Sequence, residues 1–463
     1  MRGILSHAGY LPYRRLDRAG IAAVAGTGGG RGTRTASSYD EDTTTMGVEA
    51  ARLALRAAPG FSPAALVFST TRPAYADKTN ATAIHAALRL DPGVVAADQC
   101  GAVRSAVVSL RGALLSSEAV LVVAADERTG LPGGPEEAGG GDGASALAVG
   151  DDTDGPVLAE FLGSASATEE FLDRWRAPGE QRPRVWEERF GEGRYTALGE
   201  QAWEAALKRS GLEAGDVAHL IVTGTHTRAV ATVARRLAGA AAVADELLTS
   251  VGQTGAAHPG LLFASVLDTA PPNRVIALVS LADGADVCFF RTTEALASFV
   301  PARPVATQVA GGGPLSYGKF LAWKGLLTVE PPRRPEPARV SASAAARRTP
   351  WKFGFVGSRS SDTGDIALPP AVAGAGGPLE DLPMADTQGR VATFTVDRLA
   401  YSPSPPVVFA VVDFDGGGRL PVELTDVDPD GIAIGDRVEM TFRRLSSADG
   451  IHNYFWKARP VRG

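Results

Sequence analysis

Short apolar runs alternate with longer segments of helical periodicity along residues 1–297. The runs have strand length, and the segments between them repeat apolar residues every three or four positions. This alternation predicts an α/β domain with largely parallel, buried strands. The expected strands are residues 66–69, 119–124, 147–149, 219–223 and 274–280, and the expected helices are residues 44–57, 81–88, 105–115, 195–210, 228–237 and 260–268.

The pattern divides this region into two halves, residues 1–155 and 156–297, each built on a strand–helix–strand core. A glycine-rich stretch at residues 133–143 is expected to act as a hinge. It is not a phosphate loop, because it lacks the Gly-Lys-Ser/Thr ending and carries acidic residues.

The pattern changes twice in the last third of the chain. Residues 298–387 are rich in proline and lack sustained periodicity, which predicts a linker with a docking helix at residues 317–327. Residues 388–463 contain five short strand patterns separated by Gly or Asp turns, which is typical of a small OB-fold barrel.

Composition narrows the classes of function. A length of 463 residues favours two or three domains, and a net charge of -6 gives no reason to expect nucleic acid or an anionic membrane as partner. Two cysteines do not make a disulfide scaffold. With no apolar run of about 18 residues and no signal-peptide core, the expectation is a cytoplasmic protein.

Residues 98–104 form the most informative segment. Apolar or small residues flank them on both sides, which predicts a strand, a tight turn and a helix. Such a turn presents a side chain at a helix N-terminus, where the helix dipole favours developing negative charge.

This turn resembles the nucleophile turn of the thiolase superfamily, most closely its hydroxymethylglutaryl-CoA synthase branch. Residues 3–16, 38–51, 141–146 and 252–257 resemble other blocks of that family. The resemblance implies a duplicated αβαβα domain.

From residue 317 onwards the chain is similar to DUF35 proteins, which combine a helical lead, a zinc ribbon and an OB-fold. Residues 351–355 and 450–457 carry this match. The positions of the four zinc thiolates are instead Ser360, Thr363, Ala373 and Gly376. We therefore expect no zinc and no bound cofactor, with residues 298–387 holding a degenerate ribbon.

The chain departs from the family where the chemistry is expected. The reactive cysteine falls on Val103, and Cys100 lies three residues too early. Cys100 stays an alternative nucleophile, although a small buried cysteine at a strand end is the favoured interpretation. His226 matches the family's proton-moving histidine, and Gln253 replaces the asparagine that helps to bind the thioester oxygen. A satisfied structural histidine is the alternative at residue 226.

Other candidates surround this site. The loop at residues 70–78 lacks the family's acidic residue, which leaves Tyr75 as proton carrier with Lys78 or Arg72 as the nearby cation. Arg104 is a candidate for holding a carboxylate or phosphate, and His258 for approaching the same cleft. Surface packing or surface ion pairing is the alternative for each of these residues.

The leading hypothesis is an enzyme that acts on an acyl thioester, on coenzyme A or a carrier protein, and makes or breaks a carbon–carbon bond without a cysteine nucleophile. Retro-aldolases of steroid side-chain breakdown, which resemble this chain, also lack the cysteine and pair with DUF35 partners; His226 and Tyr75 would then be acid and base. The alternatives are synthase-like condensation or acyl transfer through Cys100, and a non-catalytic partner or scaffold. The resemblance also implies a homodimer, or a heterodimer with a thiolase-fold subunit.

Overall fold

A mixed ten-stranded sheet organises the first part of the chain. The computed structural model describes residues 1–371 and 378–462. The strand order is β12-β11-β13-β14-β8-β1-β7-β6-β4-β5. Within the described residues, no helix is long and apolar enough to cross a membrane.

The sheet is an internal duplication. In each half, three strands run parallel and two antiparallel strands complete the order. The first half contains β1 (Arg2–Tyr10), β4 (Ala65–Thr70), β5 (Val95–Cys100), β6 (Val120–Asp126) and β7 (Gly143–Asp151). The second contains β8 (Ala159–Ala167), β11 (Val217–Gly224), β12 (Ala242–Val243), β13 (Val275–Leu281) and β14 (Ala285–Thr292).

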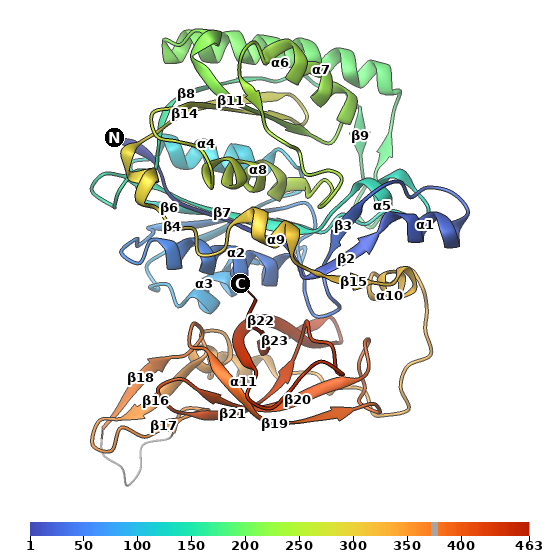
Figure 1. Ribbon diagram of the computed structural model, residues 1–463, viewed down its shortest axis with the longest axis vertical. Coiled ribbons are helices and arrows are strands. Elements are labelled where there is room, and N and C mark those ends of the chain that lie inside the picture. The colour runs from blue at the N-terminus through green and yellow to red at the C-terminus, as the bar shows by residue number, and fades with distance from the viewer. Residues whose placement is uncertain (372–377, 463) are drawn as a thin grey trace.

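Helices cover both faces of each half and create an αβαβα stack (Figure 1). One pair of helices lies between the two half-sheets, and one pair covers each outer face. The inner helices are α4 (Ser105–Leu115) and α8 (His258–Leu267), and the outer ones are α2 (Thr43–Ala57), α3 (Ala81–Leu88), α6 (Glu188–Ser210) and α7 (Thr227–Leu237). The halves meet where β1 pairs briefly with β8. This approach requires Gly3, because a Cβ there would lie 2.0 Å from the carbonyl oxygen of Ala159.

The prediction of a hinge at residues 133–143 is wrong. The stretch connects β6 with β7 inside the first half and contains helix α5 (Pro135–Gly139). Its glycines serve close packing, since a Cβ on Gly141 would lie 2.1 Å from the carbonyl oxygen of Val251.

The remaining elements of the first 310 residues are short. Two strands form a separate small sheet with β15 of the linker, and two form the hairpin β9–β10. They are β2 (Arg14–Asp17), β3 (Thr33–Ala36), β9 (Arg174–Trp175) and β10 (Arg184–Val185), with helices α1 (Arg18–Ala25) and α9 (Val305–Ala310) and 3-10 helices at Ala214–Asp216, Gly255–Ala257 and Glu294–Ser298.

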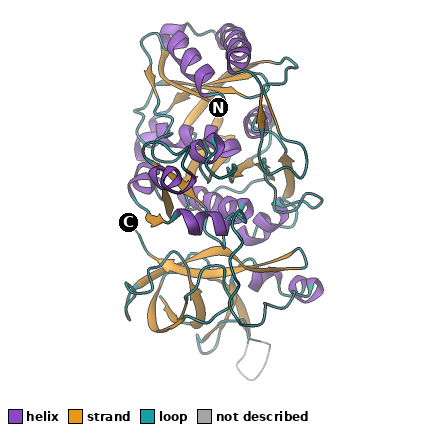
Figure 2. Cartoon of the chain, turned by 90° about the vertical axis from the view of Figure 1, so that its right-hand side faces the viewer, coloured by secondary structure: helices purple, strands orange, loops and turns teal. Residues whose placement is uncertain are grey.

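The C-terminal part is a closed all-β barrel, as predicted, with strand order β19-β20-β21-β23-β22. Figure 2 shows it as a strand-rich body below the helices of the α/β part. Its strands are β19 (Gly389–Asp397), β20 (Val407–Phe414), β21 (Arg419–Leu424), β22 (Arg437–Ala448) and β23 (Ile451–Pro460).

The connecting segment is partly ordered into short elements. They are β15 (Gly313–Leu315), α10 (Tyr317–Trp323), α11 (Ala342–Ala346), α12 (Thr349–Lys352), β16 (Val356–Ser360), β17 (Ile366–Ala367) and β18 (Leu379–Pro383). The predicted docking helix is α10. Of the positions that replace the zinc thiolates, Ala373 and Gly376 lie outside the described residues.

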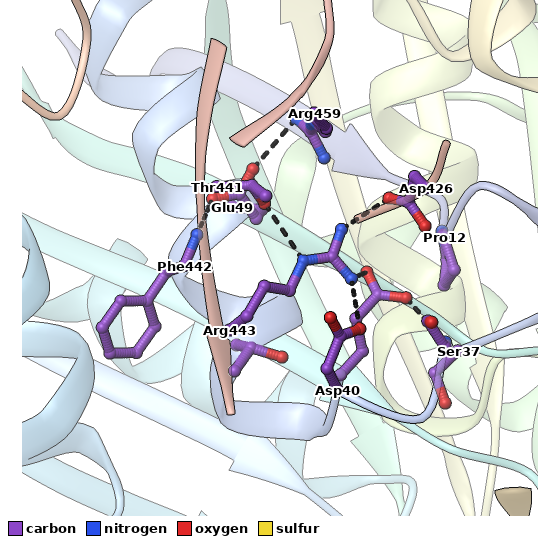
Figure 3. A network of polar contacts seen from close by, with 12 residues as sticks. Pro12, Ser37, Asp40, Glu49, Asp426, Thr441, Phe442, Arg443 and Arg459 are labelled. Carbon is purple, nitrogen blue, oxygen red and sulfur yellow. Dashed lines mark hydrogen bonds and ion pairs between the residues drawn. The ribbon is translucent and has the colours of Figure 1, made fainter. Parts of the chain in front are cut away.

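A buried network of charges attaches the barrel to the start of α2 (Figure 3). The guanidinium of Arg443 contacts Asp40 at 3.4 Å, Glu41 at 2.8 Å and Asp426 at 2.7 Å, and all four side chains are buried. The ammonium of Lys457 lies 3.0 Å from the other carboxylate oxygen of Asp40. Of the three acidic residues that precede α2, Asp42 caps the helix, whereas Asp40 and Glu41 pair with the barrel.

Candidate functional site

A cleft of about 160 Å³ lies where parallel strands of both halves end. Its lining includes residues that directly follow β4, β5, β6, β11 and β13, an arrangement in which α/β sheets commonly bind ligands. The hairpin β9–β10 and helices α5 and α6 complete the wall. The lining residues are Thr71, Arg72, Gly101, Ala102, Val103, Glu127, Arg128, Thr129, Glu136, Arg174, Trp175, Arg176, Gln181, Pro183, Tyr195, Thr225, Ala282 and Asp283.

The predicted turn borders this cleft. Gly101, with φ of 110°, turns the chain after β5, and Val103 lines the cleft two residues before α4 begins. Arg104 points elsewhere: its Nε donates to Asp286 at 2.7 Å and one terminal nitrogen donates to the carbonyl oxygen of Asp283 at 2.8 Å. Arg104 therefore joins the two halves and does not line the cleft.

Cys100 lies at the end of β5, outside the cleft lining. The expected burial of this residue is wrong, because β5 is the last strand of the sheet and Cys100 is exposed at its end. Partial desolvation and the carboxylate of Asp98 raise the pKa of the thiol to about 11. At neutral pH the side chain is a thiol, which is a weak nucleophile.

His226 is the N-cap of α7. Its Nδ1 accepts a hydrogen bond from the amide of Ala229 at 3.1 Å, so Nε2 carries the proton and donates it to the carbonyl oxygen of Glu188 at 2.9 Å. Both ring nitrogens are thus engaged within the fold. The imidazole ring packs against the ring of Tyr195, with the two ring centroids 5.9 Å apart. His226 itself does not line the cleft.

Gln253 and His258 are both buried, and His258 is the first residue of the inner helix α8. The amide nitrogen of Gln253 donates to the carbonyl oxygen of Gly224 at 3.1 Å, which places Gln253 near His226 at the end of β11. His258 is fully buried, and burial lowers its pKa to about 4, so its imidazole is neutral. Neither side chain lines the cleft.

Tyr75 and Lys78 face away from the cleft. The hydroxyl of Tyr75 accepts a hydrogen bond from the amide of His452 at 2.8 Å, and the two rings lie 4.9 Å apart, so Tyr75 contacts the barrel. The ammonium of Lys78 donates to Thr79 and Thr82 at the surface. The roles predicted for these residues stay predictions.

Tyr195 and Asp283 are cleft residues that the sequence interpretation missed. Burial and the neighbouring charge of Asp173 raise the pKa of Tyr195, so its hydroxyl stays protonated; it accepts a hydrogen bond from the amide of Asp283 at 3.4 Å and donates one to the carboxylate of Asp173. Partial desolvation raises the pKa of the exposed Asp283, against the opposing charge of Arg104. The signal for Asp283 was its place in a tight turn between two strand patterns, whereas Tyr195 lies within a long helix and gave no signal.

No metal site is found among the described residues, where no three His, Cys, Asp or Glu side chains are grouped to hold an ion. The absence of zinc stays a prediction, because half of the degenerate ribbon positions lie outside those residues.

Curated relatives match both parts of the chain. The hydroxymethylglutaryl-CoA synthase of Aeropyrum pernix is 30% identical over 346 residues, which cover 71% of this chain and 95% of the relative. A DUF35 domain-containing scaffold protein of Methanothermobacter thermautotrophicus is 30% identical over 123 residues, covering 25% of this chain and 92% of the relative. The family model "ChsH2, C-terminal OB-fold domain" matches residues 383–443.

Solved structures share the fold of the first part. A hydroxymethylglutaryl-CoA synthase complexed with CoA has a TM-score of 0.58 at 18% identity, covering 69% of this chain and 89% of that one. The 3-oxoacyl-(acyl carrier protein) synthase III of Pseudomonas aeruginosa has a TM-score of 0.54 at 22% identity, covering 65% of this chain and 99% of that one. The predicted thiolase-like α/β fold with a C-terminal OB-fold is confirmed.

Proposed function

The chain belongs to the hydroxymethylglutaryl-CoA synthase family, with a DUF35-type OB-fold at its C-terminal end, and from this membership we propose that it acts on an acyl thioester. It makes or breaks a carbon–carbon bond without an acyl-cysteine. The observation that carries this proposal is that Val103, on which the family's thiol falls by the sequence resemblance, lines the cleft. The thioester would lie over Val103, near the N-terminus of α4.

Cleavage of a β-hydroxyacyl thioester fits the side chains of the cleft. Asp283, whose raised pKa favours proton uptake, takes the proton of the β-hydroxyl. The electron pair of the Cα–Cβ bond then remains on the thioester fragment as an enolate. Tyr195 turns its hydroxyl from Asp173 and donates a hydrogen bond to the thioester oxygen, where charge develops, and the proton returns from Asp283 to the α-carbon. The reverse sequence is a condensation, and neither direction needs an oxidant or reductant.

Asp283 and Tyr195 take these roles in preference to the predicted pair His226 and Tyr75, because they line the cleft and the predicted pair does not. The two ring nitrogens of His226 cap α7 and bind Glu188, while the hydroxyl of Tyr75 binds the barrel. The ring of His226 instead packs against the ring of Tyr195.

The test is turnover of β-hydroxyacyl-CoA thioesters by the full chain. With 3-hydroxy-3-methylglutaryl-CoA in the panel, we expect a shorter acyl-CoA and a carbonyl compound in equal amounts, without an acyl adduct in the intact protein mass. Tyr195→Phe lowers turnover, whereas Cys100→Ala leaves it unchanged. An acyl group on Cys100 would establish the alternative, a condensing enzyme or acyltransferase with an unconventional nucleophile.

A non-catalytic partner or scaffold is the second candidate. The imidazole and amide predicted for catalysis are engaged within the fold, and one DUF35 relative is named a scaffold protein. Binding of acyl-CoA without turnover across the panel, alone and with a thiolase-fold partner, would favour this role.

We also propose that the chain dimerises through β5. This edge strand leaves one row of backbone groups unpaired, and apolar side chains are exposed on it and on the adjoining α4. Val95 is 62% exposed, Val108 40% and Leu115 64%. An unprotected edge of this kind is a template for strand pairing. A second copy is the proposed partner; a thiolase-fold heterodimer is the alternative outcome.

A further inference from the structure

We propose that a cavity between the barrel and the α/β part binds a phosphate group, held by Arg15 and Arg462. The cavity has a volume of about 70 Å³, and its described lining residues are all different from those of the cleft. The inference goes beyond the proposed function and does not depend on it.

The wall of this cavity comes from three parts of the chain. Arg15 belongs to β2 of the α/β part, and Arg303 precedes α9. Arg459 belongs to β23 of the barrel, and Arg462 follows that strand. Figure 1 shows this end of the chain between α9 and the barrel. A group bound in the cavity therefore contacts the barrel and the α/β part at the same time.

The two carboxylates on the wall are already neutralised. Glu439 accepts hydrogen bonds from Arg303 at 2.7 Å and from Arg459 at 2.9 Å. Asp426 accepts one from Arg443 at 2.7 Å. These pairs complete one side of the cavity and leave no carboxylate there to serve the two remaining guanidinium groups.

Arg15 is a guanidinium without a countercharge. Its terminal nitrogens donate to the backbone carbonyl oxygens of Pro12, Arg14 and Gln308, the last at 2.5 Å. Its Nε is buried and has no hydrogen-bond partner among the described residues. Burial lowers the pKa of Arg15 to about 10. Carbonyl oxygens orient the group, but they carry no net charge and leave its own uncompensated.

Arg462 faces the cavity from the barrel side. Its guanidinium carbon lies 3.5 Å from the centroid of the Tyr13 ring, and one terminal nitrogen donates to the backbone carbonyl oxygen of Asp426. Stacking on the ring fixes the plane of the guanidinium. Its other N–H groups have no partner among the described residues. The donors are thus held in place before any ligand arrives.

A purely structural role does not account for these two arginines. In the same interface the buried Arg443 contacts three carboxylates, and Arg303 and Arg459 share a fourth. The fold therefore supplies carboxylates where cations only join the barrel to the α/β part. Arg15 and Arg462 lack them, so we infer that their countercharge comes from outside the chain.

Charge and size favour a phosphate group. It offers oxygens in several directions and up to two negative charges, which suits guanidinium groups that approach from opposite sides. A volume of about 70 Å³ slightly exceeds the liquid volume of two water molecules, at ~30 Å³ each. Such a space holds a phosphate group but not a nucleoside. The source is either inorganic phosphate or a larger molecule whose remainder lies outside the cavity.

Calorimetric titration of the full chain with sodium phosphate at pH 7.5 tests the site, against sodium chloride of equal ionic strength. We expect Arg15→Gln and, separately, Arg462→Gln to weaken binding about 10–100-fold, because each removes charged hydrogen bonds. Arg419→Gln is the matched control: Arg419 is exposed on the same barrel and lies outside the cavity, so affinity stays unchanged.

Circular dichroism establishes that each variant is folded. Should Arg15→Gln fail to fold, Arg462→Gln decides alone, since Arg462 lies beyond the last strand of the barrel.

Stability gives a second readout, because a ligand that binds only the folded chain stabilises it. We expect phosphate, at constant ionic strength, to raise the urea midpoint and to slow the proteolytic release of the barrel. Arg462→Gln removes both effects. Binding no stronger than that of chloride overturns the inference, and so does phosphate affinity that both variants leave unchanged.

Two further probes identify the source of the phosphate group. Adenosine monophosphate that binds more tightly than inorganic phosphate, and is weakened by Arg462→Gln, supports the site and assigns it to a larger molecule. Binding of inorganic phosphate alone supports the site and assigns it to the free anion. If coenzyme A displaces phosphate and is itself weakened by Arg462→Gln, the arginines belong to the thioester site and the inference is overturned. Failure of thioester turnover refutes only the proposed function.

Discussion

Replacing Arg443 by methionine tests whether buried charges hold the barrel on the α/β part. The side chain of methionine is apolar and of similar length, so it removes the charge while largely filling the space. Asp40 keeps Lys457 at 3.0 Å, but Glu41 and Asp426 lose their ion pairs at 2.8 and 2.7 Å.

The expected loss is large because the carboxylates stay buried. Removing one partner of a buried ion pair typically destabilises a protein by about 3–5 kcal/mol. One oxygen of Asp426 already has no hydrogen-bond partner among the described residues, so the fold has no spare donor to replace the arginine there. We therefore expect the free energy of unfolding to fall by about 3–5 kcal/mol.

Urea unfolding followed by tryptophan fluorescence measures the effect, because Trp456 of the barrel is fully buried. Limited proteolysis reports whether the barrel separates first. Arg419→Met is the matched control: it removes an exposed pair with Asp413 in the same barrel, and we expect an unchanged midpoint. A loss below about 1 kcal/mol for Arg443→Met would refute the reasoning, since that is the value of a solvent-exposed pair.

Burial alone would raise the pKa values of Asp40 and Glu439, but their paired cations hold both at about 2. Because these folded-state pKa values lie below the unfolded values near 4, the stability that the two carboxylates contribute is present above about pH 4–5 and lost as the pH falls towards 2. The free energy of unfolding measured across this pH range checks this. Asp40→Asn should make that free energy less dependent on pH. Iodoacetamide at pH 7.5 should alkylate Cys100 slowly, with a rate that rises towards pH 11, and should leave the fully buried Cys288 unmodified until urea is added. Mass spectrometry of the peptides identifies the alkylated residue. Rapid labelling of Cys100 at pH 7.5 would contradict its raised pKa. Val95→Asp should convert a dimer into a monomer in light scattering, and a monomeric unmodified chain at micromolar concentration would refute pairing through β5.

Local patterns in the sequence were sufficient for the fold class. Apolar periodicity reports which side chains are buried, and it predicted both the α/β part and the five-stranded barrel. The turn at residues 98–104 was also readable, since a strand, a glycine and a helix follow one another directly. The replacement of the family's thiol by Val103 needed only the resemblance.

The tertiary structure decided how the cleft is lined and which charges are paired. Its wall joins Arg72, Arg128, Arg176 and Asp283, which are far apart along the chain and meet because strand ends and the β9 hairpin converge. The same packing turned His226 into a helix cap. A sequence pattern records whether a side chain is buried, whereas the direction of each hydrogen bond depends on neighbours that only the folded chain brings together.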